Sequence, residues 1–113
     1  MNHPEIAKSE AHIIIELIEY IPNCILSRTI IKKSTGNVTA YSFDSGEGLM
    51  ENISPFDTFA QIIDGEAEII IDGSSHKLRT GEAIVIPAHR PNAIKAHERF
   101  KMLLTIIKSG YED

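Results

Sequence analysis

Short apolar runs recur along the chain, and turn-forming residues separate them. Ile is frequent within these runs, while Gly, Pro, Asn and Asp lie between them. Strands favour β-branched residues, and many short strands with turn signals between them are typical of a sandwich or a barrel. The pattern therefore predicts an all-β fold rather than a helical one.

The N-terminal third contains one predicted hairpin and one ambiguous segment. Residues 24–33 and 37–43 flank a Ser-Thr-Gly turn signal and are expected to pair as antiparallel strands. Residues 11–21 suit either a strand or a single helical turn before Pro22, which ends a helix. Residues 1–10 are polar and are expected to be a flexible terminus.

A second hairpin is predicted in the middle of the chain. Residues 59–63 and 66–71 flank Asp64-Gly65, a dipeptide that suits a two-residue type I′ turn. The Asp-Gly pair at residues 72–73 is expected to form a turn of the same kind. Further strands are expected at residues 76–78, 83–86, 93–96 and 100–107.

Length and charge exclude several classes of protein. The 113 residues suit a single domain, and the net charge of −5 comes from 11 basic and 16 acidic side chains that are scattered along the chain. A nucleic-acid partner would require a basic face, and a membrane span would require about 20 consecutive apolar residues. The sequence therefore predicts no nucleic-acid partner and no membrane partner.

The start of the chain and its cysteine content bear on location. The first residues lack a basic stretch followed by an apolar one, which argues against export. Cys24 is the single cysteine, so it cannot form an internal disulfide and suits a reducing compartment. We expect a cytoplasmic protein in which Cys24 is a core or interface residue.

Two segments between residues 46 and 96 carry a recognisable spacing. The first has Gly46 and Gly65, and the second has Gly81 and Pro87. These residues fall in register with the two signature motifs of the cupin superfamily, G-x5-H-x-H-x3-E-x6-G and G-x5-P-x-G-x2-H-x3-N. The chain resembles the small single-domain bacterial cupins of the RmlC-like type. The resemblance implies one cupin domain over residues 1–113, folded as a double-stranded β-helix or jelly-roll barrel.

The metal-binding positions of the motifs are substituted. In cupins with the full signature, three His and one Glu hold Fe, Mn, Zn, Ni or Cu. Asn52, Ser54, Thr58 and Asn92 stand at those positions here, and Ala96 stands at the final Asn. Neutral amide and hydroxyl oxygens bind transition metals poorly. We therefore expect no metal and no cofactor at the usual cupin site.

His89 is the histidine nearest to the substituted site. It occupies the Gly position of the second motif, three residues before Asn92. An exposed loop histidine is one interpretation, and a lone metal ligand, base or hydrogen-bond donor is the other. His76 and His97 are both expected on the exposed outer face.

The remaining features predict a ligand pocket in the barrel. Strand alternation from Asn52 is expected to turn one set of side chains inward. The candidate pocket residues are Met50, Asn52, Ser54, Thr58, Ala60, His89, Asn92 and Met102, with Ile62, Ile94, Ala96 and Leu104 also inward. Apolar walls with a few converging polar groups suit a small organic ligand.

Three functions fit this pattern. The first is a metal-free module that binds a small organic molecule. The second is a metal-dependent or metal-free enzyme, an oxygenase or isomerase, with a non-standard site that includes His89. Cupin sugar epimerases show that a barrel can work without metal, but they need a His base and a Tyr acid, and the sequence places neither Tyr20 nor Tyr41 in the pocket. The third is a purely structural or interaction protein.

A homodimer is also expected. The alternating apolar residues of the segments 24–33 and 100–107 leave a stripe on the outside of the predicted barrel. Such a stripe is larger than a monomer normally exposes, and cupins commonly bury it by pairing two barrels.

Overall fold

The computed structural model describes residues 5–110, and its regular structure is almost entirely β-sheet. A short 3₁₀ helix, η1 (Ile14–Glu16), precedes the strands. The strands are β1 (Ile25–Lys33), β2 (Gly36–Phe43), β3 (Gly48–Ile53), β4 (Thr58–Ile71), β5 (Ser74–Arg79), β6 (Ala83–Ile86), β7 (Pro91–Lys95) and β8 (Phe100–Ile107). Within the described residues, no helix is long and apolar enough to cross a membrane.

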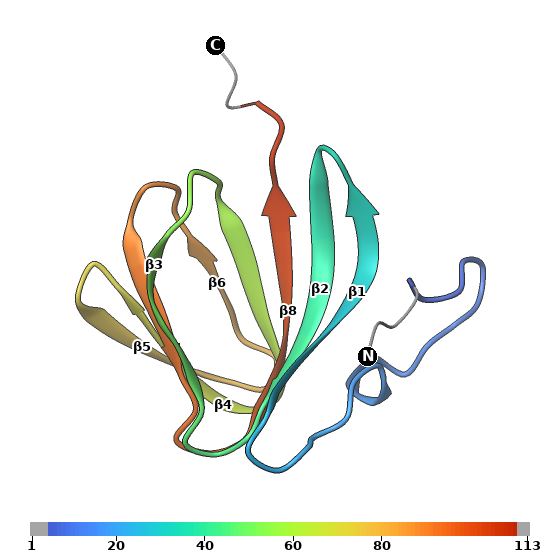
Figure 1. Cartoon of the computed structure of the whole chain (residues 1–113), viewed down its shortest axis with the longest axis horizontal. Helices are drawn as coiled ribbons and strands as arrows, with labels where there is room; N and C mark the ends of the chain where they lie inside the picture. Colours follow the sequence, from blue (N-terminus) through green and yellow to red (C-terminus); the bar gives the residue numbers. More distant parts are fainter. Residues whose placement is uncertain (1–4, 111–113) are drawn as a thin grey trace.

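All eight strands join one curled sheet, and β4 connects its two halves. The main order is β1-β2-β8-β4-β7-β3, and β5 and β6 also pair with β4. The first part of β4 pairs with β6 and β8, whereas the second part pairs with β5 and β7. Figure 1 shows the two halves of the sheet diverging from β4 like the sides of an open cup. The expected all-β jelly-roll fold is confirmed.

A β-bulge in β4 changes which residues face the interior. The register with β8 shifts between Ile62 and Asp64. Before the shift the buried residues are at even positions, such as Ala60 and Ile62, and after it they are at odd positions, Ala67 and Ile69. One additional residue moves every later side chain of a strand to the opposite face. The bulge therefore keeps apolar residues inward on both halves of the sheet.

The predicted hairpin at Asp64-Gly65 is wrong, because β4 continues through both residues. A type I′ turn needs a positive φ at both central residues. Gly65 has a φ of 87°, but Asp64 is not in the left-handed region. Asp64 instead accepts a hydrogen bond of 2.7 Å from the Tyr20 hydroxyl. Both a bulge and a turn can use an Asp-Gly pair, so this dipeptide does not distinguish them.

The other turn and strand predictions agree with the structure. The segment before Gly36 joins β1 to β2 as an antiparallel hairpin. Asp72 and Gly73 have φ values of 51° and 79°, so this second Asp-Gly pair does have the positive φ values of a type I′ turn. The predicted strands at 83–86 and 100–107 coincide with β6 and β8, and those at 76–78 and 93–96 overlap β5 and β7.

Most of the buried side chains form one cluster between the two halves of the sheet. Phe43 and Phe100 stack at its closed end, with ring centroids 4.6 Å apart. Buried apolar surface of this kind is the main stabilising contribution to a small domain. The full inner cluster contains Phe43, Ala60, Ile62, Ala67, Ile69, Leu78, Ile86, Ile94, Ala96, Phe100, Met102 and Leu104.

A smaller cluster lies on the outer face of the first half of the sheet. Ile18 from the N-terminal segment packs there with Ala40 and Leu103. The Ser42 hydroxyl donates a hydrogen bond of 2.7 Å to the carbonyl oxygen of Glu19. Of the two structures considered for residues 11–21, only a single 3₁₀ turn forms, and the segment covers part of the sheet.

Substitution of Gly65 tests the importance of the bend in β4. A Cβ atom at this position would lie 2.5 Å from the carbonyl oxygen of Arg99 and 3.0 Å from the Cα atom of Phe100. We expect Gly65→Ala to lower the free energy of unfolding by about 2–4 kcal/mol, from the left-handed φ and the overpacking together.

Gly73→Ala is the matched control for urea denaturation. Gly73 also has a positive φ, but nothing lies within 4 Å of a Cβ placed there. Gly73→Ala should therefore lower the free energy of unfolding by only about 1–2 kcal/mol, which is the conformational penalty alone. Equal losses for the two variants would contradict the close-approach explanation.

Candidate functional site

The two motif segments lie on neighbouring strands and bring Asn52 and Asn92 together. Asn52 on β3 is directly opposite Asn92 on β7, and Leu49 is opposite Ile94. Residues directly opposite each other share a face of the sheet. Ile94 belongs to the inner cluster, so Asn52 and Asn92 lie on the inner face of the sheet, where Asn52 is exposed and Asn92 is half-buried. The Asn92 Nδ2 atom donates a hydrogen bond of 3.2 Å to the backbone carbonyl oxygen of Asn52.

Met50 does not face the interior, so its predicted inward position is wrong. The register of β3 with β7 shifts between Leu49 and Asn52. The irregularity leaves Leu49 and Asn52 on the same face although three positions separate them. Met50 is 90% exposed as a result. Regular alternation from Asn52 fails here because the sequence carries no sign of the bulge.

Ser54 and Thr58 flank the loop that enters β4. The Ser54 hydroxyl accepts a hydrogen bond of 3.1 Å from the backbone N–H of Phe56. Thr58 is buried and lies opposite Ile86 of β6 and Ile106 of β8. Thr58 therefore faces the interior from the first half of the sheet, whereas Asn52 and Asn92 face it from the second half.

Ala60 and Met102 have the inward orientation that was expected of them. Both side chains are fully buried in the inner cluster. They lie in the packed floor below the polar positions, together with Ile62, Ile94, Ala96 and Leu104. Contact between a ligand and any of these residues stays a prediction.

The His89 side chain is exposed, and its backbone has the conformation expected at this position of the motif. Its φ is 65°, a conformation that glycine adopts without strain, and the cupin motif has Gly at this position. The His89 N–H donates a hydrogen bond of 2.7 Å to the carbonyl oxygen of Ser54. Nearby, Asp57 Oδ1 accepts one of 2.7 Å from the Ala88 N–H. The loop after β6 is therefore tied to the loop before β4.

Tyr41 and His76 lie on the inner face of the sheet, where the sequence did not place them. Tyr41 on β2 lies opposite the fully buried Met102, and burial raises the pKa of its phenol above the ordinary value. His76 on β5 lies opposite the fully buried Ile69. The expectation that His76 faces outward is therefore wrong. The bulge in β4 moves its inner residues to odd positions, and His76 follows its partner Ile69.

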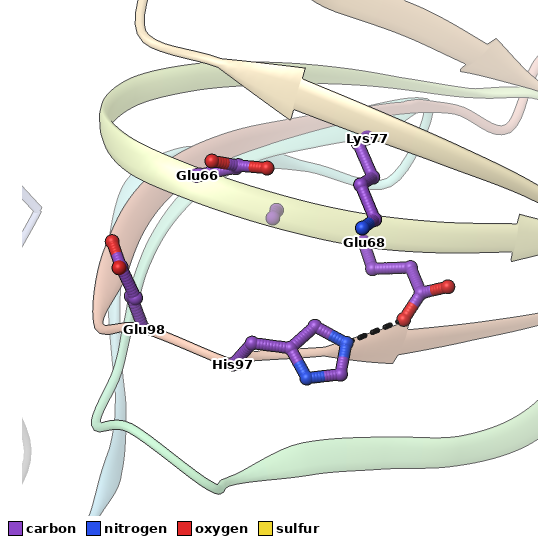
Figure 2. A pocket seen from close by; sticks show the side chains of 6 residues that line it. Glu66, Glu68, Lys77, His97 and Glu98 are labelled. Atoms are coloured by element: carbon purple, nitrogen blue, oxygen red, sulfur yellow. Dashed lines mark hydrogen bonds and ion pairs between the residues drawn. The ribbon is translucent and has the colours of Figure 1, made fainter.

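A separate shallow pocket lies on the outer face of the second half of the sheet, and Figure 2 shows its side chains. His97 Nε2 is 2.6 Å from Glu68 Oε1, and Ser75 also donates a hydrogen bond to Glu68. The hydrogen bond from Ser75 and, to a smaller extent, the contact with His97 hold the pKa of Glu68 below its usual range. The pocket has a volume of about 170 Å³ and is lined by Glu66, Ala67, Glu68, Lys77, His97 and Glu98.

His97 is exposed, as the sequence predicted, but it also has a defined partner. The contact with Glu68 joins β4 to the turn between β7 and β8. Glu68 lies opposite Lys95 and Lys77 on the neighbouring strands. This arrangement is a network of opposite charges on the outside of the sheet, away from Asn52 and Asn92.

The residues at the cupin metal positions do not fit a transition metal. Asn52, Ser54, Thr58 and Asn92 offer only neutral oxygen atoms in place of imidazole nitrogens and a carboxylate. Across residues 5–110, no three His, Cys, Asp or Glu side chains converge in a way that could hold a metal ion. The chemistry of the site is therefore hydrogen bonding by amides and hydroxyls.

Restoring two histidines tests whether the cupin frame persists around Asn52 and Asn92. Directly opposite residues on paired strands have Cβ atoms about 4.5–5.5 Å apart, so two imidazoles there can share one ion. We expect Asn52→His with Asn92→His to take up Zn²⁺ or Ni²⁺ by calorimetry, and Asn52→His alone to bind at least tenfold more weakly. A folded double variant that binds no better than the single variant would show that the motif register is wrong.

The contacts of Glu68 with Ser75 and His97 should make stability depend on acidic pH. Because the folded-state pKa of Glu68 is lowered, its contribution is present above the ordinary glutamate pKa of about 4.3 and is lost as pH falls through the folded value. In thermal denaturation, wild type should be more stable than Glu68→Gln at about pH 5.5, and the difference should shrink towards about pH 3.

Glu66→Gln is the matched control for this titration. Glu66 lies on the same strand, but it is 4.0 Å from its partner Arg79, which is largely exposed. Exposed pairs of this kind contribute little to stability. A pH-independent effect of Glu68→Gln, or an equal pH dependence for the two variants, would count against the proposed role of Glu68.

Several solved structures are similar to this chain, although no protein-family model and no curated protein matches it. A conserved Streptococcus pyogenes protein of unknown function is 30% identical, with a TM-score of 0.88 over 96% of this chain and 95% of its own. A cupin superfamily protein from Desulfitobacterium hafniense is 29% identical, with a TM-score of 0.86 over 92% and 95% of the two chains.

A third similar structure is a longer protein. The Cupin 2 conserved barrel domain protein from Leptotrichia buccalis is 35% identical, with a TM-score of 0.80 over 83% of this chain, which spans 46% of that protein. The fold, the spacing of Gly46, Gly65, Gly81 and Pro87, and these similarities agree with one another. The chain belongs to the cupin superfamily.

Proposed function

We propose that this chain is a metal-free binding module that holds a small organic molecule at the open end of its barrel. The observation that supports the proposal is the pairing of Asn52 with Asn92 on the inner face of β3 and β7. These residues stand where other cupins carry metal-binding histidines, and both keep the inward orientation.

The chemistry of the two amides indicates the class of ligand. The Asn92 Nδ2 atom is already a donor to the backbone of Asn52, which orients the side chain. In this orientation, the Asn92 carbonyl oxygen can accept a hydrogen bond from a ligand, while the Asn52 amide supplies a donor and an acceptor. Neither group carries charge. A neutral molecule with hydroxyl, carbonyl or amide groups therefore suits them best.

Apolar neighbours complete the proposed site. Ile71 on β4 lies opposite Asn92, and Leu49 follows the same inner face of β3. Tyr41 and Thr58 face the interior from the other half of the sheet. A few placed polar groups on a mainly apolar wall are typical of small-molecule sites. We also propose a cytoplasmic location, because the free Cys24 would remain reduced there.

A second candidate function is a metal-free isomerase, and one observation favours it. Tyr41 and His76 both face the interior, from opposite halves of the sheet. A neutral phenol can donate a proton, and a neutral imidazole can accept one. The exposed position of His89 makes it less suited to this role than His76. Exchange of a carbon-bound hydrogen of a bound compound for deuterium would support the enzyme over the binding module.

Thermal-shift measurements with a panel of monosaccharides, polyols, small ketones and primary amides test the binding proposal. We expect at least one class to raise the melting temperature of the wild type, and calorimetry to show its affinity reduced at least tenfold in Asn92→Ala, about 1.4 kcal/mol. The reason is the loss of an oriented amide.

His89→Ala is the control, and it should change the affinity by less than tenfold because His89 is exposed. A ligand whose affinity is insensitive to Asn92→Ala would place binding elsewhere. A tenfold loss in His89→Ala, with Asn92→Ala unaffected, would favour a site built around His89 instead.

A further inference from the structure

The segment of residues 13–24, called the strap below, lies outside the ladder of strands. Figure 1 shows it in blue, running past the start of β1. Its regular structure is the single turn of η1, and no residue of the strap pairs with a strand. The inner cluster contains none of its residues. The packing inside the barrel therefore does not depend on the strap, which is held to the outer face.

Side chains of three different strands hold the strap by its backbone. They donate hydrogen bonds to the carbonyl oxygens of every second residue, Ile15, Leu17 and Glu19. In the same order, the donors are Lys101 of β8, Arg28 of β1 and Ser42 of β2, at 2.6, 3.0 and 2.7 Å. Backbone carbonyl groups need partners when they are removed from water. The sheet supplies these partners through its side chains, in place of a strand ladder.

Two side chains of the strap, at alternate positions, are also held by the outer face. Ile18 packs into the smaller apolar cluster. The Tyr20 hydroxyl donates a hydrogen bond of 2.7 Å to Asp64 Oδ2. Arg99 Cζ and Lys101 Nζ lie 4.7 and 4.8 Å from the centroid of the Tyr20 ring. A cation within about 6 Å of the face of an aromatic ring is attracted to it.

These contacts have the form in which proteins bind extended peptides. Bonds to the main chain give affinity for any sequence, and sites for alternate side chains give specificity. Here the main-chain bonds go to three carbonyl groups, and the alternate side chains are Ile18 and Tyr20. The strap therefore occupies the outer face as a bound peptide would.

The closed strap leaves one polar group unsatisfied. Arg28 lines a groove of about 350 Å³ between the strap and β1. Its Nε atom is buried and has no hydrogen-bond partner, the one side-chain nitrogen or oxygen of this kind within residues 5–110. A buried donor without a partner costs free energy, and water can satisfy it once the strap moves away. This cost favours a strap that can be displaced.

A turn next to β1 provides the hinge for such a movement. Asn23 has a positive φ of 61°, and the Cys24 N–H donates a hydrogen bond of 3.2 Å to the carbonyl oxygen of Ile21. Cys24 itself is tied to the sheet, because its carbonyl oxygen accepts a hydrogen bond from the Asp44 N–H. The strap can therefore rotate before this turn while β1 stays in place.

We propose that the strap is a peptide ligand held in cis, and that the outer face beneath it binds an extended segment of a partner protein when the strap opens. The partner segment carries the pattern of the strap, an aliphatic residue followed two positions later by tyrosine. A tethered ligand has an effective concentration on the order of millimolar, so the closed state dominates until a partner competes. This inference does not depend on the ligand proposed for the inner face.

Hydrogen exchange of the full chain tests whether the strap opens by itself. The N–H groups of Leu17 and Cys24 donate hydrogen bonds within the strap, so their exchange reports its opening. We expect Tyr20→Ala to speed this exchange at least about tenfold and to leave the amides of β8 nearly unchanged, because the barrel stays folded. Tyr20→Phe keeps the ring and should give a smaller effect in the same direction.

Ile13→Ala is the matched control, because Ile13 belongs to the strap but is exposed. It should leave the exchange of Leu17 and Cys24 close to that of the wild type. Equal acceleration of the strap and of β8 in Tyr20→Ala would show that the two unfold together and would overturn the proposal. An effect of Ile13→Ala as large as that of Tyr20→Ala would overturn the role of Tyr20.

Fluorescence anisotropy with a labelled synthetic peptide of residues 11–23 tests binding in trans. We expect the Tyr20→Ala chain to bind this peptide at least about tenfold more tightly than the wild-type chain does, because its own strap competes less well. A peptide that itself carries Tyr20→Ala should bind at least about tenfold more weakly. No binding, or equal binding by the two chains, would overturn the proposed surface. Equal binding of the two peptides would overturn the recognition of tyrosine.

Discussion

The passage of β4 from one half of the sheet to the other is the constraint on which the rest of the structure depends. Gly65 carries the backbone through a left-handed conformation, at a point where an added Cβ atom would lie 2.5 Å from the carbonyl oxygen of Arg99. The adjoining bulge changes the inward positions from even to odd. Without that change, a single strand of 14 residues could not supply the inner cluster on both sides.

The architecture was readable from the sequence because its signals are local. Turn dipeptides and β-branched runs mark most strand ends, and the spacing of Gly46, Gly65, Gly81 and Pro87 marks the cupin frame. Each of these signals reports a backbone requirement at one place. Asp64-Gly65 shows the limit of such signals. A bulge and a hairpin need the same dipeptide, and only pairing with distant strands decides between them.

The site was only partly readable for a related reason. Asn52 and Asn92 were both expected in the pocket because they stand at ligand positions of the two motifs. The pairing of β3 with β7 puts them directly opposite each other. Met50 was misplaced because a second bulge interrupts the alternation that the prediction assumed. His76 and Tyr41 were missed because their orientation follows from their partners Ile69 and Met102 and not from their own neighbours in the chain. A one-residue irregularity changes the face of a side chain, so orientation is less predictable than the strand itself.

The cupin backbone thus persists here without the ligands that it usually presents. His89 has the left-handed φ that a glycine at this position of the motif would adopt without strain. Elemental analysis of the protein, purified without an affinity tag and compared with its dialysis buffer, measures whether the chain carries a metal ion. We expect Fe, Mn, Ni, Cu and Zn far below one ion per chain. A near-stoichiometric amount of any of these metals would contradict this expectation.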